Sequence, residues 1–190
     1  MLAKLDQLLK FGDNEQVLEI LAIQNSLSLE ERIYKARALE MRFDESIFEA
    51  EEIINDVIHQ LKPLNDKILE LKARSTKLHI LLKFLNFRLI QQELDAWIHL
   101  WEQCTVHEKD TLKQNYAAYL TAKSVTDHSR TTDSEVWNSA SQEIKLVIEI
   151  FEYLDDYHDV SWALYLKFMI ERDRENKEAF QETLSSVLHS

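Results

Sequence analysis

The sequence predicts an all-α protein, and three observations lead to this prediction. The chain of 190 residues contains one glycine, Gly12, and one proline, Pro63, whereas usual frequencies are about 7% and 5%. β-Hairpins need turn pairs such as Asn-Gly or Asp-Gly, and neither pair occurs. Leu, Ile, Glu, Lys, Gln and Ala, which favour helices, dominate the composition. We therefore expect one domain over residues 1–190, with 45% hydrophobic residues available for a core.

The spacing of apolar residues predicts about ten helices, arranged in antiparallel pairs with short connections. They are expected near residues 2–9, 17–22, 28–42, 44–61, 64–86, 90–101, 112–120, 132–154, 162–169 and 176–187. Pro63 separates the fourth helix from the fifth, because a proline inside a helix costs about 3 kcal/mol. The apolar seam nevertheless continues in phase through Pro63, so one kinked helix over 44–86 is the alternative. A phase shift after Asn86 predicts the next turn.

Capping side chains support several helix starts. Ser28 with Glu31, and Thr132 with Glu135, match the capping box, in which the two side chains each bond to the other residue's backbone N–H. Single capping residues are expected at Asp44 and Asn176. Loops are expected at 24–27, 103–108 and 124–133. The last of these is the longest polar segment without periodicity, and we expect it to be mobile.

Segment 61–89 has the most regular helical pattern in the chain. Its apolar residues alternate between intervals of three and four, with one polar step at Ser75: Leu61, Leu64, Ile68, Leu71, Leu78, Leu82, Leu85 and Leu89. This spacing is typical of a helix packed lengthwise against other helices. The segment is also basic in an acidic protein. Residues 62–88 carry seven Lys or Arg against Asp66 and Glu70, a local charge of +5, while the chain carries −12.

Three joints between paired helices share a pattern. They are Leu9-Lys10-Phe11-Gly12-Asp13, Met41-Arg42-Phe43-Asp44 and Phe84-Leu85-Asn86-Phe87. At these joints the sequence resembles tetratricopeptide repeats, which have a small, polar or aromatic turn between helices and often a proline at the repeat's end, where Pro63 stands. The joints are 30 and 44 residues apart and do not keep the family's period of about 34 residues. The resemblance implies a right-handed solenoid of helix pairs whose concave face holds a partner peptide or protein. An irregular helical bundle is the alternative.

Composition excludes several functional classes. Phosphate-binding loops and dinucleotide fingerprints need several glycines, which the sequence lacks, so no nucleotide cofactor is expected. A single cysteine, Cys104, permits no intrachain disulfide and fits a reducing compartment, so we expect a cytoplasmic protein. No window is apolar enough to span a membrane. The charge of −12 opposes binding to nucleic acid.

Two constellations are candidates for chemistry. Asp155, Asp156 and Asp159, in the segment Asp-Asp-Tyr-His-Asp, match the magnesium-diphosphate motif of isoprenoid synthases. Such enzymes need a second acidic motif, which we do not find, so we favour a solvated helix end. Cys104 and His107 have the residue types of a nucleophile and its base, without a third group to orient them. We therefore expect no catalytic residue, no metal and no cofactor.

The basic helix is the best candidate for a binding site. We favour the interpretation that its cations pair with neighbouring acidic helices, since residues 40–56 and 135–159 each carry seven acids against a single Lys or Arg. The second interpretation is a groove for an acidic peptide, and nucleic acid ranks third. The candidate contact set comprises Arg74, Lys77, His79, Lys83, Tyr116, Tyr119 and Lys123.

From this interpretation we predict a non-enzymatic adaptor or scaffold that binds another protein, with an acidic partner segment as one option. The first alternative is a helical bundle that self-associates through the seam at 61–89, which would make the protein a homo-oligomer. The second is a small magnesium-dependent isoprenoid or diphosphate enzyme that uses the three aspartates of segment 155–159.

Overall fold

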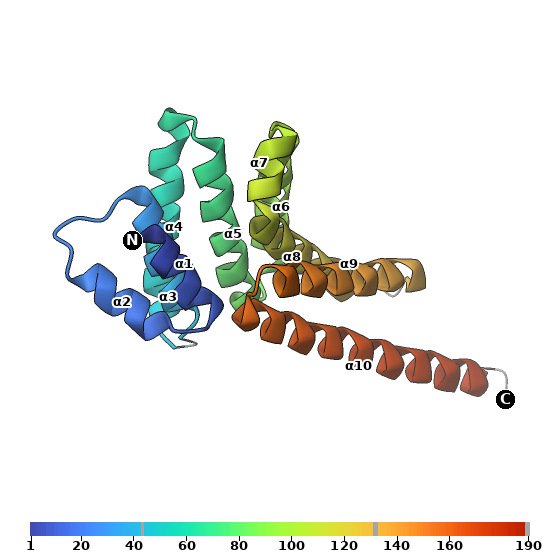
Figure 1. Cartoon of the computed structure of the whole chain (residues 1–190). Coiled ribbons are helices and arrows are strands. Elements are labelled where there is room, and N and C mark those ends of the chain that lie inside the picture. The colour runs from blue at the N-terminus through green and yellow to red at the C-terminus, as the bar shows by residue number, and fades with distance from the viewer. Residues whose placement is uncertain (43, 131–132, 189–190) are drawn as a thin grey trace.

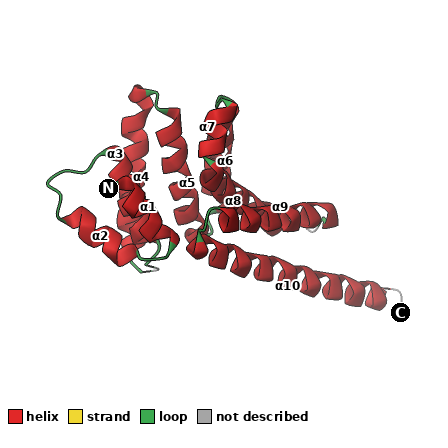
Figure 2. Ribbon diagram, viewed as in Figure 1, coloured by secondary structure: helices red, strands yellow, loops and turns green. Residues whose placement is uncertain are grey.

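The computed structural model describes residues 1–42, 44–130 and 133–188. This part of the chain is all-helical, without a strand, and the helices are joined by short loops, the longest of which connects the second and third helices (Figure 2). The elements are α1 (Leu2–Lys10), α2 (Asn14–Ala22), α3 (Leu29–Glu40), α4 (Ser46–Leu61), the 3-10 turn η1 (Lys62–Leu64), α5 (Lys67–Phe84), α6 (Phe87–Glu102), α7 (Val106–Thr111), α8 (Lys113–Arg130), α9 (Ser134–Tyr153) and α10 (Tyr157–Leu188). The predicted all-α class is confirmed.

Helices that follow one another in the sequence pack against each other. The closest neighbours are α3 with α4, α5 with α6, α8 with α9, and α9 with α10. The helices α1, α3, α5, α8 and α10 also contact one another in that order. In Figure 1, α4 and α5 stand side by side, and α9 and α10 run at a steep angle to them.

The buried apolar residues form four clusters rather than one central core. Each cluster lies between successive helices: α1, α2 and α3; α3, α4 and α5; α5, α6 and α8; and α8, α9 and α10. Each of these helices therefore buries apolar residues against its neighbours, and α3, α5 and α8 each contribute to two clusters.

The first and last parts of the helical array touch. Helix α1 contacts α10, and the ring of Phe11 stacks on that of Tyr157 with their centroids 5.5 Å apart. Gly12 makes the turn between α1 and α2 with φ of +78°, a conformation that other residues rarely adopt. A Cβ at this position would lie 3.5 Å from Nδ1 of His158, so the turn passes close to the start of α10.

Several predicted boundaries are confirmed. Ser28 and Glu31 form the predicted capping box at the start of α3. The helices on either side of Pro63 are separate, because η1 and a left-handed Asn65 intervene and Asp66 caps α5. The turn after α5 is also present, with Leu85 left-handed and Asn86 capping α6.

Three boundaries differ from the predictions. Segment 124–130 is the last part of α8 and not a loop; residues 131–132, including the predicted capping residue Thr132, lie outside the described residues. Segment 106–111 is helical, because Thr105 and Glu108 form a capping box that we did not predict. Helix α10 continues through Asn176, where a new helix was expected to start. Among the described residues, no helix is both long and apolar enough to span a membrane.

The seam at 61–89 belongs to the interior of the fold. Leu61, Leu71 and Leu78 are fully buried, whereas Leu64 and Leu85 at its ends are exposed. The polar step at Ser75 has a structural reason. Its hydroxyl donates to the carbonyl of Leu71 (2.8 Å) and accepts the indole N–H of Trp97 (3.0 Å). In this fold, the central positions of the seam are not available to a second copy of the chain.

Candidate functional site

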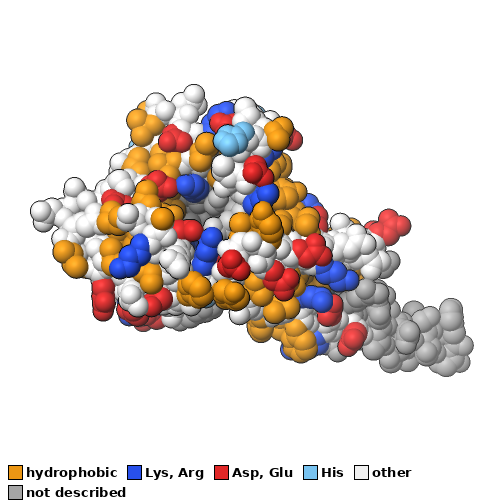
Figure 3. Space-filling view, viewed as in Figure 1, with side chains coloured by type: hydrophobic (Ala, Val, Ile, Leu, Met, Phe, Trp, Pro, Cys, Tyr) orange, Lys and Arg blue, Asp and Glu red, His pale blue; other side chains and the backbone are white. Residues whose placement is uncertain are grey.

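A polar cleft lies where the two ends of the array meet. It has a volume of about 410 Å³ and is lined by residues of α1, α3 and α5 on one side and of α7, α8 and the α9–α10 turn on the other. Figure 3 shows the surface hollowed in this region, with charged side chains around it. Most of the lining residues are polar or charged. Apolar side chains such as Leu2, Ile33 and Leu154 also line the cleft, so it offers a ligand both hydrogen-bonding groups and apolar contacts.

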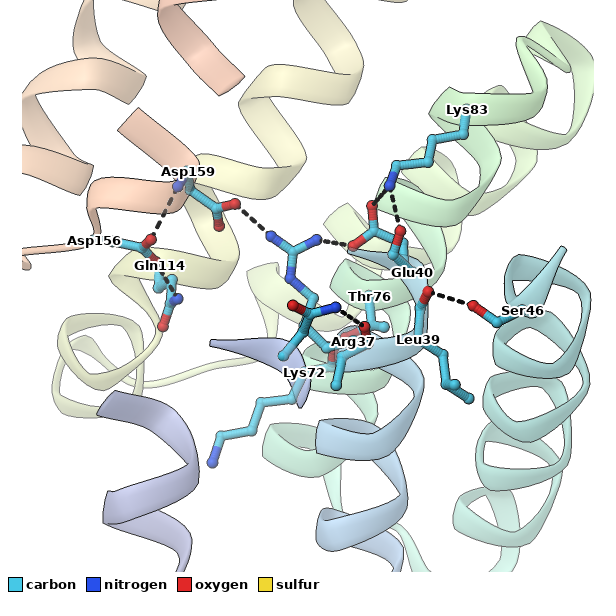
Figure 4. Close-up of polar contacts among 12 residues, drawn as sticks. Arg37, Leu39, Glu40, Ser46, Lys72, Thr76, Lys83, Gln114, Asp156 and Asp159 are labelled. Atoms are coloured by element: carbon cyan, nitrogen blue, oxygen red, sulfur yellow. Dashed lines mark hydrogen bonds and ion pairs between the residues drawn. The ribbon is translucent and has the colours of Figure 1, made fainter. Parts of the chain in front are cut away.

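A buried ionic cluster borders the cleft, and two of its members, Arg37 and Asp159, line it. Arg37 on α3 points toward α10, and its guanidinium pairs with Glu40 on one side and with Asp159 on the other (Figure 4). Lys83 on α5 reaches the same Glu40 carboxylate, with Nζ 2.7 Å from Oε1. These side chains are between 4% and 12% exposed. The cluster therefore joins α3, α5 and α10 through charged hydrogen bonds.

Local structure explains how these groups are positioned. Arg37 and Glu40 are three residues apart on α3, so they lie on neighbouring faces of one helix. Asp159 lies in the first turn of α10, where its backbone N–H donates to Oδ1 of Asp156 (3.0 Å). The second carboxylate oxygen of Asp156 accepts from Nε2 of Gln114 on α8 (2.7 Å). The start of α10 is thus fixed to both α3 and α8.

The buried environment shifts the pKa values in opposite directions. Burial, together with the nearby charge of Asp159, raises the pKa of Asp156 to about 7. Burial also disfavours ionised Glu40 and Asp159, but the charge of Arg37, together with the other positive groups and hydrogen bonds around each carboxyl, outweighs burial and holds the pKa of both below the usual value. Burial and the Arg37 charge lower the pKa of His79 to about 4, so this imidazole is neutral at pH 7. The pKa of His158 is lowered for the same reasons.

The predicted basic contact residues are engaged within the fold. Arg74 pairs with Glu93 of α6 (2.5 Å), and Lys77 pairs with the same carboxylate (3.2 Å). Lys83 pairs with Glu40, as described above, and Lys123 pairs with Glu143 of α9 (2.6 Å). The favoured interpretation of the basic helix, pairing with acidic neighbours, agrees with these contacts.

The remaining members of the predicted contact set lie in different places. Tyr119 stacks on Trp97 and Tyr116 stacks on Trp101, at centroid distances of 4.7 and 5.0 Å, in the cluster between α5, α6 and α8. His79 is buried and lines the polar cleft. The structure therefore does not bring the seven residues together on one surface, and of the seven only His79 lines this cleft.

The two groups that the sequence offered as candidates for chemistry are the aspartates of segment 155–159 and the pair Cys104 and His107. Asp155 is exposed in a left-handed turn, while Asp156 and Asp159 are buried and bonded as described above. Within the described residues, no three His, Cys, Asp or Glu side chains are grouped as metal ligands. The Cys104 thiol is buried, its Sγ lies 3.5 Å from the carbonyl oxygen of Leu100, and burial together with the charge of Glu108 raises its pKa. A raised pKa lowers the fraction of reactive thiolate.

Arg37, the centre of the cluster, was not among the predicted site residues. The residue pattern of α3 could have indicated it. In the sequence Arg37 stands between two alanines and two residues before Leu39, and the structure shows that Ala36 and Ala38 are both fully buried. A charged residue in such a helix needs a buried partner.

We compared the chain with known proteins. No family model, no curated protein and no solved structure matches it.

Proposed function

We propose that the protein is a non-enzymatic interaction module whose polar cleft binds a short peptide segment of a partner protein, so that it acts as an adaptor or scaffold. The observation that carries this proposal is the cleft itself, which has a volume of about 410 Å³ and is lined by polar, charged and apolar residues of helices from both ends of the array. A peptide presents backbone and side-chain polar groups that such a lining can bond. On this proposal the stacked pairs are a solenoid similar to tetratricopeptide repeats.

The pairing of charges supports an interaction module over an enzyme. Arg37, Glu40, Asp159 and Lys83 are all used in contacts within the cluster. General acids and bases must exchange protons with a substrate, and groups held in mutual buried ion pairs are poorly placed to do so. The case for an acidic partner segment is also weakened, because four cations of the basic helix, Lys72, Arg74, Lys77 and Lys83, already pair with acids of the fold.

A peptide library tests this proposal. We expect random nonapeptides displayed on phage to be enriched on the wild-type protein. The variant Asn115→Trp should lose the enrichment. Asn115 lines the cleft, and the much larger indole side chain of tryptophan would fill part of the space that the peptide needs. The matched control is Gln92→Trp on α6, an exposed position outside the cleft, which should keep it. Equal enrichment on both variants would overturn the assignment of the peptide to the cleft.

Self-association is a second candidate, favoured by a different surface of the molecule. Leu164, Tyr165 and Phe168 on α10 form an exposed apolar stripe, each about half exposed. An antiparallel pair of α10 helices centred between Leu164 and Tyr165 would place Tyr157 of one copy opposite Arg172 of the other. Arg172 already lies 6.0 Å from the Phe168 ring, and cations favour aromatic faces.

Analytical ultracentrifugation of the wild type and of Phe168→Glu tests the second candidate. We expect a dimer at micromolar concentration that the variant dissociates. Ile23→Glu, at an isolated position that is 85% exposed, should leave the dimer intact. A wild-type monomer at these concentrations would refute self-association and would leave the peptide-binding proposal untouched.

A further inference from the structure

The buried ionisable groups of the cluster beside the cleft are unequal in number. Among the described residues, the acids of the cluster are Glu40, Asp156 and Asp159, and its cations are Arg37 and Lys83. The two neighbouring histidines add no charge at pH 7, because burial lowers the pKa of each. The cluster therefore holds one more carboxyl group than it has cations, and this carboxyl is about half ionised at pH 7 because its pKa is about 7.

The excess carboxylate is Asp156, and it borders the cleft. Its side chain is bonded to two neutral donors, the Asp159 backbone N–H and the Gln114 amide, and in the described part of the chain it forms no ion pair. The residue is 2% exposed and contributes to the cleft lining. An ionised carboxylate can accept about four hydrogen bonds, so two remain for a ligand. Its raised pKa, about 7, is what a buried carboxylate without a paired cation shows.

The cations nearer the cleft opening are already paired. Lys10 lies 3.3 Å from Asp6, Lys72 lies 2.7 Å from Glu30, and Lys113 lies 2.7 Å from Asp110. An acidic ligand would have to displace these carboxylates. A cationic ligand would displace nothing, and it would also be attracted by the chain's net charge of −12.

We infer that the peptide segment bound in the cleft carries a lysine or arginine, and that its cationic side chain pairs with the carboxylate of Asp156. This inference rests on the proposed function and names the chemistry of its ligand. The ligand cation completes the charge balance of the buried cluster. Gln114 orients the carboxylate from α8, and the Asp159 backbone N–H orients it from α10.

Three synthetic nonapeptide libraries test the inference. Each is randomised at eight positions and has a fixed central residue, which is lysine, norleucine or glutamate. We expect immobilised wild-type protein to retain the lysine library about tenfold or more over the norleucine library, since a charge-assisted hydrogen bond contributes about this factor. Asp156→Asn should lose this preference, because the amide keeps the shape and removes the charge. The matched control, Asp155→Asn, removes the same charge at the exposed neighbour and should keep it.

The outcomes separate the inference from the proposed function. A lysine preference that survives in Asp156→Asn, or a wild-type preference for norleucine or glutamate, overturns the inference while peptide binding stands. Retention of every library no better than on Asn115→Trp overturns the proposed function itself. Unfolding of Asp156→Asn is monitored by its melting temperature, which we expect to be at least that of the wild type at pH 8, since a buried unpaired charge is removed.

Discussion

Replacing Arg37 with methionine tests whether the ionic cluster holds the two ends of the array together. The substitution removes the cation that pairs with both Glu40 and Asp159. Glu40 retains Lys83, whereas Asp159 is left buried without its cation. Breaking a buried ion pair by removing one partner costs about 3–5 kcal/mol. Methionine preserves the apolar stem of the side chain, so most of this loss comes from the stranded charge.

Urea unfolding, followed by tryptophan fluorescence and far-ultraviolet circular dichroism, measures this loss. The control is Arg32→Met on the same helix, whose guanidinium pairs with Asp56 at 2.5 Å in a position where the acid is half exposed. An exposed ion pair contributes less than about 1 kcal/mol. Adding Asp159→Asn to Arg37→Met should recover part of the lost stability, because the stranded charge is then removed. If Arg37→Met costs no more than Arg32→Met, the cluster does not stabilise the fold and this argument fails.

Three further predictions concern the same region of the fold. The Asp156 carboxyl binds its proton more tightly in the folded state, where its pKa is about 7, than in the unfolded chain, where the usual value is 3.8. The wild-type free energy of unfolding should therefore fall as pH rises from about 4 to about 7, by up to about 4 kcal/mol from this group; Asp156→Asn, measured by urea unfolding at pH 5 and pH 8, should lack this contribution. Lys83→Glu should lower the free energy of unfolding by about 3 kcal/mol or more, and with it the melting temperature, because it places a second carboxylate beside buried Glu40; an unchanged melting temperature would show that the Lys83–Glu40 pair does not stabilise the fold. Gly12→Ala should cost about 1 kcal/mol in urea unfolding, because φ is +78° while the added Cβ has room; no loss would mean that the turn adjusts without strain.

The sequence determines those features of the fold that depend on local chemistry. The break at Pro63 is a property of the proline ring. The start of α3 at Ser28 follows from the capping box that Ser28 forms with Glu31, three residues further along the chain. The phase shift of the apolar residues after Asn86 likewise indicates a turn, and the turn lies within a few residues of the shift. Because each cause lies next to its effect in the chain, each could be predicted without knowledge of tertiary structure.

The failed loop prediction shows where local chemistry is insufficient. Segment 124–130 is polar and lacks an apolar period, yet Ser124, Thr126 and His128 are buried in α8. The Ser124 hydroxyl donates to Glu143 of α9 at 2.8 Å. Packing against α9 therefore stabilises a helix whose own pattern does not predict one, because tertiary contacts override weak helix propensity. A count of polar residues could not reveal this partner.

The site depends most strongly on contacts between distant parts of the chain. The charge of the basic helix was evident in the sequence, and pairing with acidic helices was the favoured explanation. A count of charges in the sequence does not show which carboxyl lacks a paired cation in the fold. The pairing of Arg37 with Asp159 spans 122 residues. It depends on the placement of α10 near α3, and α10 is held there by its contacts with α1, α8 and α9. The lysine or arginine that we infer as the ligand of Asp156 is therefore a consequence of tertiary arrangement, and it reverses the charge of the partner that the basic helix alone had suggested.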